Sequence, residues 1–418
     1  MVRQIKNTLY FLVAGYFWFF ARIRLATWNP RIVVITGSNG KTSTLNLFEA
    51  QLGTFARYSH NANSSFGIPF DILGLKRNTY APSEWLSLIV RAPWHAWYKP
   101  YKEHMYVVEA DCDRPSEGQF LSSLLRPEVV VWLSSARTHS QNFERIVQTT
   151  SSVEEAIAYE FGHIAAQASK LLIINADNKL ITGQKNRTRA EVFEIKERES
   201  LEYYTVTHTG TTFTLNGITY SFPYLLPRET LYAIAAALKI AEYFGQRPNE
   251  FPGFAMPPSR SSVFSGIKNT TLIDSTYNAN VNSVDAILRM VKQLPSTTTW
   301  AVIGDLTEQG KFEKEEHEKL APLLLGAGFQ KIILVGPRLA RYTLPTLAPM
   351  HKEVVSFINP KDALDHITQT LSGGEMIVFK GARFLEGIVE HLLANSEDGK
   401  KLCRRENVWR KRRAQWGL

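Results

Sequence analysis

The chain has 418 residues, more than one compact core accommodates, so we expect two domains and an additional segment. Hydrophobic residues make up 44% and charged residues 21% of the sequence, a composition that excludes wholesale disorder. Cys112 and Cys403 are the only cysteines, which excludes a disulfide framework and a cysteine zinc site and fits a reducing compartment. The net charge of +9 favours anionic partners such as nucleotides, nucleic acid or lipid headgroups, without choosing among them.

The N-terminal segment is strongly apolar. Residues 8–21 contain no charge, with Arg3 and Lys6 before them and Arg22 and Arg24 after them. The uncharged run is shorter than the roughly 20 residues of a spanning helix, and it lacks a clear polar face. No small-residue cleavage site follows, which disfavours a signal peptide. Three interpretations stay open: an interfacial or re-entrant membrane anchor, a helix packed on the protein or on a second subunit, and a true span.

A short β-branched strand at residues 31–36 runs into a glycine-rich turn and then a helical pattern. Gly37 and Gly40 allow the backbone to approach an anion, Lys41 suits β/γ-phosphates, and the Thr42 hydroxyl suits Mg²⁺. An ordinary strand–turn–helix corner is the alternative, and the Lys-Thr pair directly after the turn favours a phosphate-binding loop (P-loop). The residues expected to contact the nucleotide here are Gly37, Ser38, Asn39, Gly40, Lys41, Thr42 and Ser43.

The first half alternates buried strands with helices. Strands are expected at residues 105–110, 129–133 and 171–175, and a helix at 152–168. Polar residues follow each strand: Glu109 at the end of the first, His139 beyond the second and Asn175 at the end of the third. This alternation predicts a parallel α/β sheet with its site along one edge. Residues 81–102, rich in Trp, Tyr and Pro, are expected to form an irregular surface excursion.

The second half repeats the alternation after a Pro-rich boundary at residues 247–258. Before that boundary, Asn216-Gly217 predicts an antiparallel hairpin, and an Ala-rich helix is expected at residues 230–244. After the boundary, strands are expected at 271–274, 300–304, 331–336 and 376–379. The predicted fold class is α/β: a central P-loop parallel-sheet ATPase domain followed by a smaller Rossmann-like α/β domain. The basic tail is a solvated tail, an RNA-binding arm or a membrane-surface helix.

Several motifs, taken in order, resemble the Mur ligases, the ATP-dependent amide-bond ligases of cell-wall precursor synthesis. They are TGSNGKTS, NANSSFGIP, VVEADCDRPSEG, INADN, PPSRSS, LIDSTYNANVNS, VIGDLTEQG and KGARF. The sequence is most similar to the branch that adds D-Ala-D-Ala. The resemblance implies a central ATP-binding domain and a C-terminal domain, with the apolar segment before them and the basic tail after them. The expected boundaries are 1–30, 31–255, 256–398 and 399–418.

The resemblance also implies ATP and Mg²⁺ as cofactors and assigns residues to them. Lys41 and Thr42 match the phosphate-loop lysine and the Mg²⁺-binding hydroxyl, and Glu109 and His139 match two magnesium-binding residues. Arg260 matches an arginine that helps bind the nucleotide phosphates. The motif lining the nucleotide corresponds to Asp274, Tyr277, Asn278 and Asn280. The residues matching substrate-associated elements are Asn63, Ser64, Lys380 and Arg383.

Three departures from the family pattern stand out. Glu160 occupies the position expected for a carbamylated lysine, and we hypothesise that its carboxylate replaces the carbamate in the metal site. A lost second metal, or an error of alignment frame, is the alternative. Arg228-Glu229-Thr230 replaces a His-Asn element near the nucleotide base. The residues before the phosphate loop are too few for the family's UDP-sugar domain, which we therefore expect to be absent.

The predicted function is an ATP-dependent amide-bond ligase that works through an acyl phosphate. Its expected partners are a small-molecule or lipid-linked carboxylate and an amine, with an amino acid or dipeptide as the amine. We expect a cytoplasmic monomer, peripheral on the inner face of the membrane, with no nucleic-acid partner. Two enzyme alternatives are a polyamino-acid ligase and an amidating subunit that takes its amine from a partner glutaminase. A degenerate nucleotide-binding scaffold without ligase activity is the non-enzyme alternative.

Overall fold

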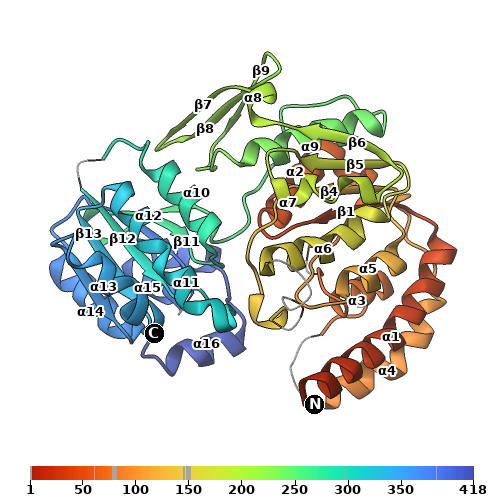
Figure 1. Ribbon diagram of the computed structural model, residues 1–418, viewed down its shortest axis with the longest axis horizontal. Coiled ribbons are helices and arrows are strands. Elements are labelled where there is room, and N and C mark those ends of the chain that lie inside the picture. Colours follow the sequence, from red (N-terminus) through yellow and green to blue (C-terminus); the bar gives the residue numbers. More distant parts are fainter. Residues whose placement is uncertain are drawn as a thin grey trace. The chain divides into compact units, whose positions relative to one another are not determined.

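The computed structural model describes residues 2–60, 62–77, 82–144, 146, 152–296, 298–382 and 384–418. The chain forms two compact units, drawn mainly in red to yellow and in green to blue in Figure 1. The first unit comprises residues 1–136, 145–199 and 232–254. The second comprises residues 137–144, 200–231 and 255–418.

The first unit is built on a six-stranded sheet in which every neighbouring pair is parallel. Its strands, in spatial order, are β2 (Arg57–Tyr58), β3 (Met105–Ala110), β1 (Arg31–Thr36), β4 (Val129–Trp132), β5 (Leu171–Asn175) and β6 (Glu191–Ile195). The central strands β3 and β4 are buried along their whole length because both faces of the sheet are covered. Thr36 pairs with Ala110 on one side and Trp132 on the other. The loops after β1, β3 and β4 therefore leave the same edge, as the sequence predicted.

The helices of this unit include the expected phosphate-loop helix and the expected helix near residue 160. Ser152 begins α6 by accepting a hydrogen bond from the backbone N–H of Glu155, which is a standard helix N-cap. The helices are α1 (Val2–Trp28), α2 (Lys41–Leu52), α3 (Gly67–Leu73), α4 (Pro82–Ala96), α5 (Glu117–Leu125), α6 (Val153–Ala166), α7 (Lys179–Thr182), α8 (Glu197–Ser200) and α9 (Thr230–Tyr243).

Helix α1 packs on the first unit through one face. Its fully buried residues Ala14, Phe17 and Ala21 recur at helical spacing and continue to Trp28. The helix contacts α3, α4 and α5, and the hydroxyl of Tyr16 donates a hydrogen bond to a carbonyl of α4 (2.8 Å). By length and composition alone, Leu9–Trp28 is apolar enough to cross a membrane, although core helices of soluble proteins and signal sequences share these properties. Of the three interpretations, packing on the protein body is therefore observed.

The prediction that residues 81–102 are irregular was wrong for residues 82–96, whereas residues 97–102 form neither helix nor strand. Residues 82–96 form α4, which lies beside α1 in Figure 1. Its buried residues Leu88, Ala92 and Ala96 recur every four residues and face the unit, a helical period that the prolines and tryptophans masked. Pro93 lies inside this helix, which shows that the proline did not end it.

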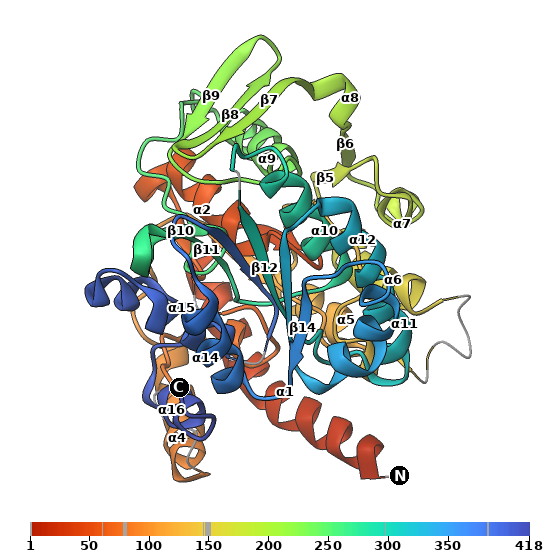
Figure 2. The ribbon, with the colours of Figure 1, turned by 90° about the vertical axis from the view of Figure 1, so that its left-hand side faces the viewer.

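The second unit has its own six-stranded sheet, parallel except for one edge strand. The spatial order is β10 (Ser262–Ser265), β11 (Thr271–Ser275), β15 (Met376–Lys380), β12 (Thr299–Gly304), β13 (Lys331–Val335) and β14 (Val354–Phe357), with β10 antiparallel to β11. Alternate residues enter two apolar cores: Ile273 belongs to one and Leu272 to the other. Figure 2 shows helices on both faces of these strands. This doubly covered sheet confirms the predicted second α/β domain type.

The helices of the second unit begin with α10 (Val281–Val291). The others are α11 (Glu313–Glu318), α12 (Leu320–Ala327), α13 (Leu344–Leu347), α14 (Pro360–Thr370), α15 (Leu385–Leu392) and α16 (Asn407–Ala414). The basic tail thus ends in a helix of this unit, and Arg413 within it is only 4% exposed.

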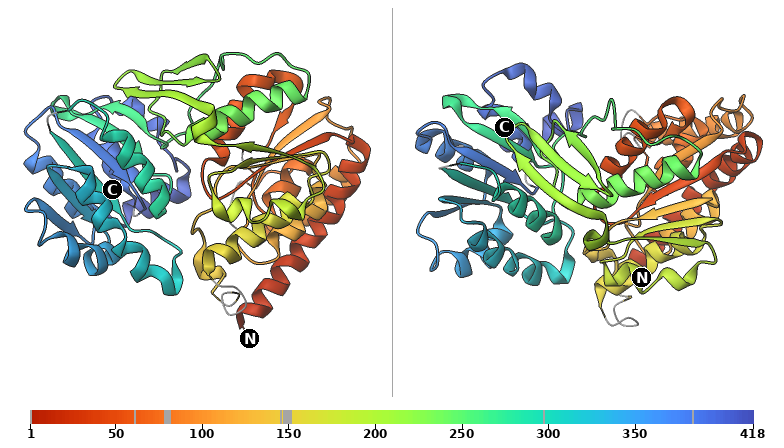
Figure 3. Two further views of the ribbon diagram at one scale, coloured as in Figure 1. Left: turned by 45° about the horizontal axis from the view of Figure 1, so that its top comes forward. Right: turned by 90° about the horizontal axis from the view of Figure 1, so that it is seen from above.

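The predicted hairpin is a three-stranded antiparallel sheet, the yellow-green ribbon in Figure 3. It contains β7 (Leu201–Thr207), β8 (Gly210–Leu215) and β9 (Ile218–Phe222). Asn216 and Gly217 connect the last two strands with φ values of 49° and 77°. Two consecutive left-handed residues give the turn that matches the strand twist, which confirms the Asn-Gly prediction.

Candidate functional site

The phosphate loop joins β1 to α2 with geometry that requires glycine. Gly37 has φ 122°, and a Cβ there would lie 2.6 Å from the carbonyl oxygen of Ser134. Gly40 has φ 80° and directly precedes α2. The backbone therefore turns tightly at both glycines and leads into a helix N-terminus, the arrangement in which exposed N–H groups receive phosphate.

Ser134, just beyond β4, holds the loop in place. Its carbonyl accepts a hydrogen bond from the Ser38 N–H (3.1 Å), and its hydroxyl accepts one from the Asn39 N–H (2.7 Å). The Ser38 hydroxyl donates in turn to the carbonyl of Ala136 (2.9 Å). The loop is thus fixed by the neighbouring strand end, a connection that no local motif indicates because Ser134 lies 95 positions from Asn39.

Lys41 lies at the start of α2 and is 9% exposed. Its ammonium donates to the carbonyl of Gly37 (2.6 Å) and pairs with Asp111 Oδ2 (2.7 Å). Burial alone would lower the pKa of Lys41, but the Asp111, Glu109 and Asp113 carboxylates more than offset it and raise that pKa. Lys41 is therefore a fixed cation at the edge of the sheet.

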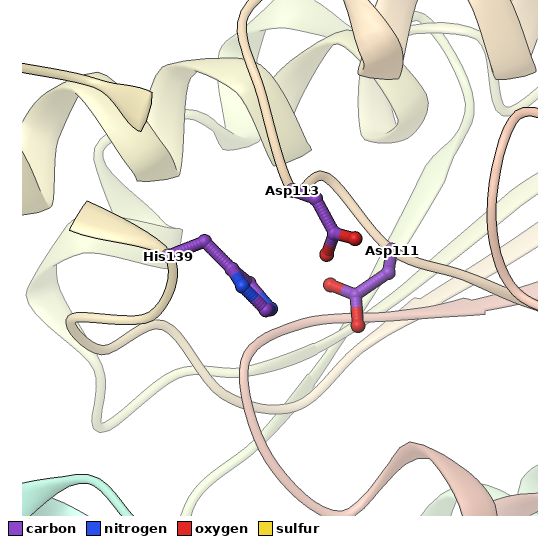
Figure 4. Close-up of side chains that lie close together, drawn as sticks. All are labelled: Asp111, Asp113 and His139. Carbon is purple, nitrogen blue, oxygen red and sulfur yellow. The ribbon is translucent and has the colours of Figure 1, made fainter. Parts of the chain in front are cut away.

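The hydroxyl of Thr42 donates to Glu109 Oε2 (3.1 Å), which places a hydroxyl and a buried carboxylate side by side. Asp111 and Asp113 follow on the segment after β3 (Figure 4), with one oxygen of each within 4.8 Å of the other. Three carboxylates around one ammonium leave excess negative charge. Hydroxyl and carboxylate oxygens are the ligands that Mg²⁺ prefers, so this donor set fits that ion, and the loop fits the phosphates that accompany it.

The substrate-associated loop lies against this segment. The carbonyl of Asn63 accepts a hydrogen bond from the Asp111 N–H (2.8 Å), and the Ser64 hydroxyl accepts one from Gly67 N–H at the start of α3 (3.1 Å). Glu117, 1% exposed, links the two segments. Its carboxylate accepts hydrogen bonds from the Ser65 hydroxyl (2.6 Å) and the Asp113 N–H (2.9 Å).

Glu117 was missed from the sequence because no local pattern marks a carboxylate that bridges two loops. Tyr10 on α1 also donates to it (3.3 Å). Burial is the main reason that the pKa of Tyr10 is raised, and the negative charge of Glu117 adds to it. The N-terminal helix therefore contacts the network behind the candidate site.

His139, a predicted magnesium ligand, lies on the segment 137–144, which groups with the second unit. Within that unit its Nδ1 pairs with the carboxylate of Glu308. Its backbone has φ 53°, an uncommon left-handed conformation for a histidine.

Glu160, the hypothesised replacement for the carbamate, is buried on α6. Its Oε1 accepts a hydrogen bond from the Gly118 N–H (2.8 Å), in the first turn of α5. Burial raises the pKa of Glu160, while backbone amides at the start of α5 partly oppose that rise. In this structure its carboxylate thus accepts a hydrogen bond from the N-terminus of α5. A role in metal binding stays a prediction.

Asn175, predicted near the nucleotide, bridges two strand ends. Its side-chain amide donates to the carbonyl of Leu133 (3.1 Å), and its oxygen accepts from the Asp177 N–H (2.9 Å). Ser43 lies half-buried in the first turn of α2.

The second unit carries the other predicted nucleotide residues: Arg260 before β10, Asp274 near the end of β11, and Tyr277 and Asn278 on the turn after it. Asp274 is fully buried and accepts hydrogen bonds from the hydroxyls of Ser259 (2.6 Å) and Thr276 (2.7 Å). Burial raises its pKa, and these hydrogen bonds oppose the rise. The guanidinium of Arg260 stacks on the ring of Tyr277 at 4.1 Å from the ring centre. A cation and an exposed aromatic face are thereby presented together.

Lys380 ends β15 and lies beside the same turn. Its ammonium donates to the carbonyl of Asn278 (2.6 Å). Burial and the nearby Arg260 lower the pKa of Lys380 to about 7, although Asp274 opposes the shift. Asn280 begins α10 as its N-cap, in a reciprocal pair of hydrogen bonds with Ser283. Arg383 lies outside the residues that the structure describes.

Comparison with known proteins identifies both halves of the chain. Residues 35–240 match the family described as Mur ligase middle domain, and residues 259–383 match the one described as Mur ligase, glutamate ligase domain. The chain is 24% identical over 386 residues to the UDP-N-acetylmuramoyl-tripeptide–D-alanyl-D-alanine ligase of Bacillus subtilis, covering 89% of this chain and 78% of that relative. The Escherichia coli enzyme of the same name is 24% identical over 323 residues, covering 73% and 64%.

Solved structures agree on the fold. The MurF ligase of Thermotoga maritima, solved in complex with ADP, superposes with a TM-score of 0.74 at 19% identity, covering 96% of this chain and 84% of that one. The folylpolyglutamate synthase of Mycobacterium tuberculosis gives 0.63 at 16% identity, covering 90% and 95%. Mur ligases form C–N bonds and use ATP and Mg²⁺ as cofactors. Because both domain families match in the expected order and the fold agrees, the chain belongs to the Mur ligase family.

Proposed function

We propose that this protein joins the carboxyl group of a cell-wall peptide precursor to the amine of an amino acid or dipeptide, with conversion of ATP to ADP and phosphate. The observation that carries the proposal is the cluster at the carboxyl ends of β1 and β3, where Lys41, Asp111, Thr42 and Glu109 surround the phosphate loop. The relatives are named for a UDP-N-acetylmuramoyl-tripeptide and D-alanyl-D-alanine, which makes a peptide carboxylate and a dipeptide the first candidates.

The proposed roles follow the chemistry of each side chain. Lys41 and the loop N–H groups bind the phosphates, because a fixed cation and aligned amides stabilise negative charge. Thr42, Glu109 and His139 hold Mg²⁺, which when bound neutralises charge on the transferring phosphoryl group. The substrate carboxylate attacks the γ-phosphorus to give an acyl phosphate and ADP, and the amine then displaces phosphate at the carbonyl carbon. The second unit contributes nucleotide contacts from Arg260, Asp274, Tyr277 and Asn278.

Substrate contacts are proposed on two elements. Asn63 and Ser64 stand on the loop that leads into α3, next to the backbone of Asp111. Lys380 and Arg383 belong to the late Lys-Gly-x-Arg element, and the low pKa of Lys380 gives it a charge that changes near neutral pH. Glu160 is proposed as a further metal carboxylate. Unchanged Mg²⁺ dependence in a Glu160→Gln variant would remove it from the metal site.

The test is ADP formation measured against a panel of peptide carboxylates, amino acids and dipeptides. We expect release of ADP only when a carboxylate and an amine are both present. Lys41→Ala is expected to lower this rate at least about 100-fold, since loss of a group that stabilises phosphoryl-transfer charge has effects of that order. Lys352→Ala, at an exposed lysine, is the matched control and is expected to keep the full rate. Full activity of Lys41→Ala would contradict the site, and ATP binding without turnover on any pair would favour a scaffold.

We further propose that the cytoplasmic enzyme docks on the inner face of the membrane through α1 and α4. The outward face of α4 presents Leu86, Val90 and Trp94, and Trp97 directly follows the helix; these four residues recur at helical spacing and are 58–72% exposed. Leu12 on α1 is 67% exposed. Exposed basic side chains accompany these apolar residues, with Arg91 among them in the sequence and Lys99 and Lys102 after them. Tryptophans on an apolar face with basic neighbours favour an anionic membrane surface, where a lipid-linked carboxylate would be supplied.

Flotation with vesicles tests this docking. Wild-type protein is expected to float with vesicles containing anionic phosphatidylglycerol and to bind zwitterionic vesicles less. Replacing Trp94 and Trp97 by serine is expected to abolish flotation. Tyr203→Ser, which removes a 55% exposed aromatic from β7, is expected to leave it unchanged. Failure of wild type to float would contradict membrane docking. So would light scattering that shows a dimer which the tryptophan replacements dissociate. Neither result would contradict the proposed ligase activity.

A further inference from the structure

The C-terminal segment contacts the turn that carries the predicted nucleotide residues of the second unit. This segment lies beyond residue 383, where the match to the glutamate ligase domain ends. The backbone N–H of Cys403 donates a hydrogen bond to the Ser259 hydroxyl (3.1 Å), which in turn donates to the buried Asp274 (2.6 Å). A residue outside the matched region therefore completes the hydrogen bonding of one inside it.

Arg404 makes the main contacts to the turn itself. Its guanidinium donates to the carbonyl of Tyr277 (2.6 Å) and to the carbonyl of Thr276 (3.3 Å). The same guanidinium lies 5.7 Å from the centre of the Tyr277 ring. A planar cation that donates to two successive carbonyls fixes their directions more firmly than a single hydrogen bond does.

Arg404 is itself held by buried charge. Glu386 on α15 is fully buried, and its carboxylate lies 3.4 Å from Arg404 and 3.6 Å from Arg413 on α16. Arg413 also donates to the carbonyl of Arg404 (2.8 Å). A buried carboxylate in this position requires its two cations. The tail, α15 and the turn are therefore held together by one network of ion pairs and hydrogen bonds. The tail is therefore a built part of this domain and not a free basic arm.

We propose that Arg404 is a positioning residue for ATP binding: it fixes the turn at Thr276 and Tyr277 and thereby orients Tyr277 and Arg260 toward the nucleotide. The inference rests on the proposed function, because that is what assigns Tyr277 and Arg260 to ATP. The Tyr277 ring is 46% exposed and stacks on Arg260, so the direction of its backbone decides where this pair points. Without Arg404, the two carbonyls lose their charged donor and the pair loses its orientation.

The experiment compares Arg404→Ala with Arg404→Lys and with Arg412→Ala as the matched control. Arg412 is exposed and stacks on Trp409 at 4.8 Å. For Arg404→Ala we expect about a tenfold weaker binding of ADP by calorimetry and a similar rise in the KM for ATP, with kcat changed less than about twofold. Arg404→Lys is expected to recover part of the affinity, since it restores charge and one donor. Arg412→Ala is expected to match wild type.

Unchanged ADP affinity in folded Arg404→Ala would overturn the proposal. So would equal losses in Arg404→Ala and Arg412→Ala, because that result would indicate a general effect of tail charge. If Arg404→Ala does not fold, the same measurements are made on Arg404→Lys and Arg404→Gln. A raised KM for ATP with nearly unchanged kcat would support the proposal, and an unchanged KM would overturn it. Failure of wild type to bind ADP would instead contradict the proposed function, so the two failures are distinguishable.

Discussion

Two buried lysines, one in each unit, have opposite electrostatic environments. Lys41 is 9% exposed and Lys380 is 6% exposed, so burial penalises both ammonium groups. The Asp111, Glu109 and Asp113 carboxylates together outweigh that penalty and raise the pKa of Lys41. Burial and Arg260 dominate at Lys380 and lower its pKa to about 7. Because burial penalises both lysines, the opposite directions of their pKa shifts come from the neighbouring charges, which are carboxylates at Lys41 and the Arg260 guanidinium at Lys380.

The two sheet edges therefore suit different ligands. The edge after β1 and β3 collects acidic groups, Glu109, Asp111 and Asp113, around one lysine, which favours a divalent cation. The turn after β11 collects the basic groups Arg260 and Lys380 over one buried aspartate, which favours an anion. A ligase that binds a metal nucleotide and a carboxylate needs both kinds of surface.

The largest predicted effect is a difference between the two lysines in how the unfolding free energy depends on pH. Lys380 titrates near pH 7 in the folded protein and near 10.4 when unfolded, so the unfolded chain holds more protons between these values. The free energy of unfolding should therefore rise across that window, by at most about 5 kcal/mol. Lys380→Met lacks this titration, so its stability advantage over wild type, measured by urea unfolding, is expected to shrink from pH 7 to pH 10.

Lys41→Met is the control for that experiment. Because the pKa of Lys41 is raised, the lysine is protonated in both folded and unfolded states below about pH 10. Its difference from wild type is expected to stay flat over the same window. Parallel curves for the two variants would show that the lysine environments do not differ as described.

The second prediction concerns stability: alanine is compared at one glycine near each lysine. Gly37 has φ 122° and Gly381 φ 131°, and a Cβ on either would lie 2.6 or 2.5 Å from a backbone oxygen. Replacement of either by alanine should cost about 3 kcal/mol of unfolding free energy, combining strain and collision. Gly40→Ala, at φ 80° in open space, should cost only about 1 kcal/mol.

Gly326→Ala supplies the opposite control. Gly326 lies within α12 with open space around its Cα, so alanine should stabilise the protein by up to about 1 kcal/mol. Equal unfolding midpoints for Gly37→Ala and Gly40→Ala would show that the Ser134 carbonyl does not restrict the loop.

What the sequence revealed was local. The phosphate loop, the Asn216-Gly217 hairpin and the strand ends each depend on a few neighbouring residues, and the structure places them where expected. The partners that complete the site come from distant segments: Ser134 meets the loop from the end of β4, and Arg404 reaches Tyr277 across 127 positions. No periodicity or motif marks such pairs. Helix α4 was missed for a different reason, because its tryptophans and prolines obscured a regular buried face.

The smallest predicted effect concerns Asn280, which the family resemblance assigned to the nucleotide and the structure shows as the N-cap of α10. Asn280→Ala should cost about 1 kcal/mol of stability, because the Ser283 N–H loses its acceptor, whereas Asn280→Asp should keep it. Calorimetry with ADP separates the two roles. If Asn280 acts only as a cap, the ADP affinity of Asn280→Ala should stay within about twofold of wild type. A loss of affinity that Asn280→Asp shares, without loss of stability, would instead mean that the amide contacts the nucleotide and that the cap is incidental.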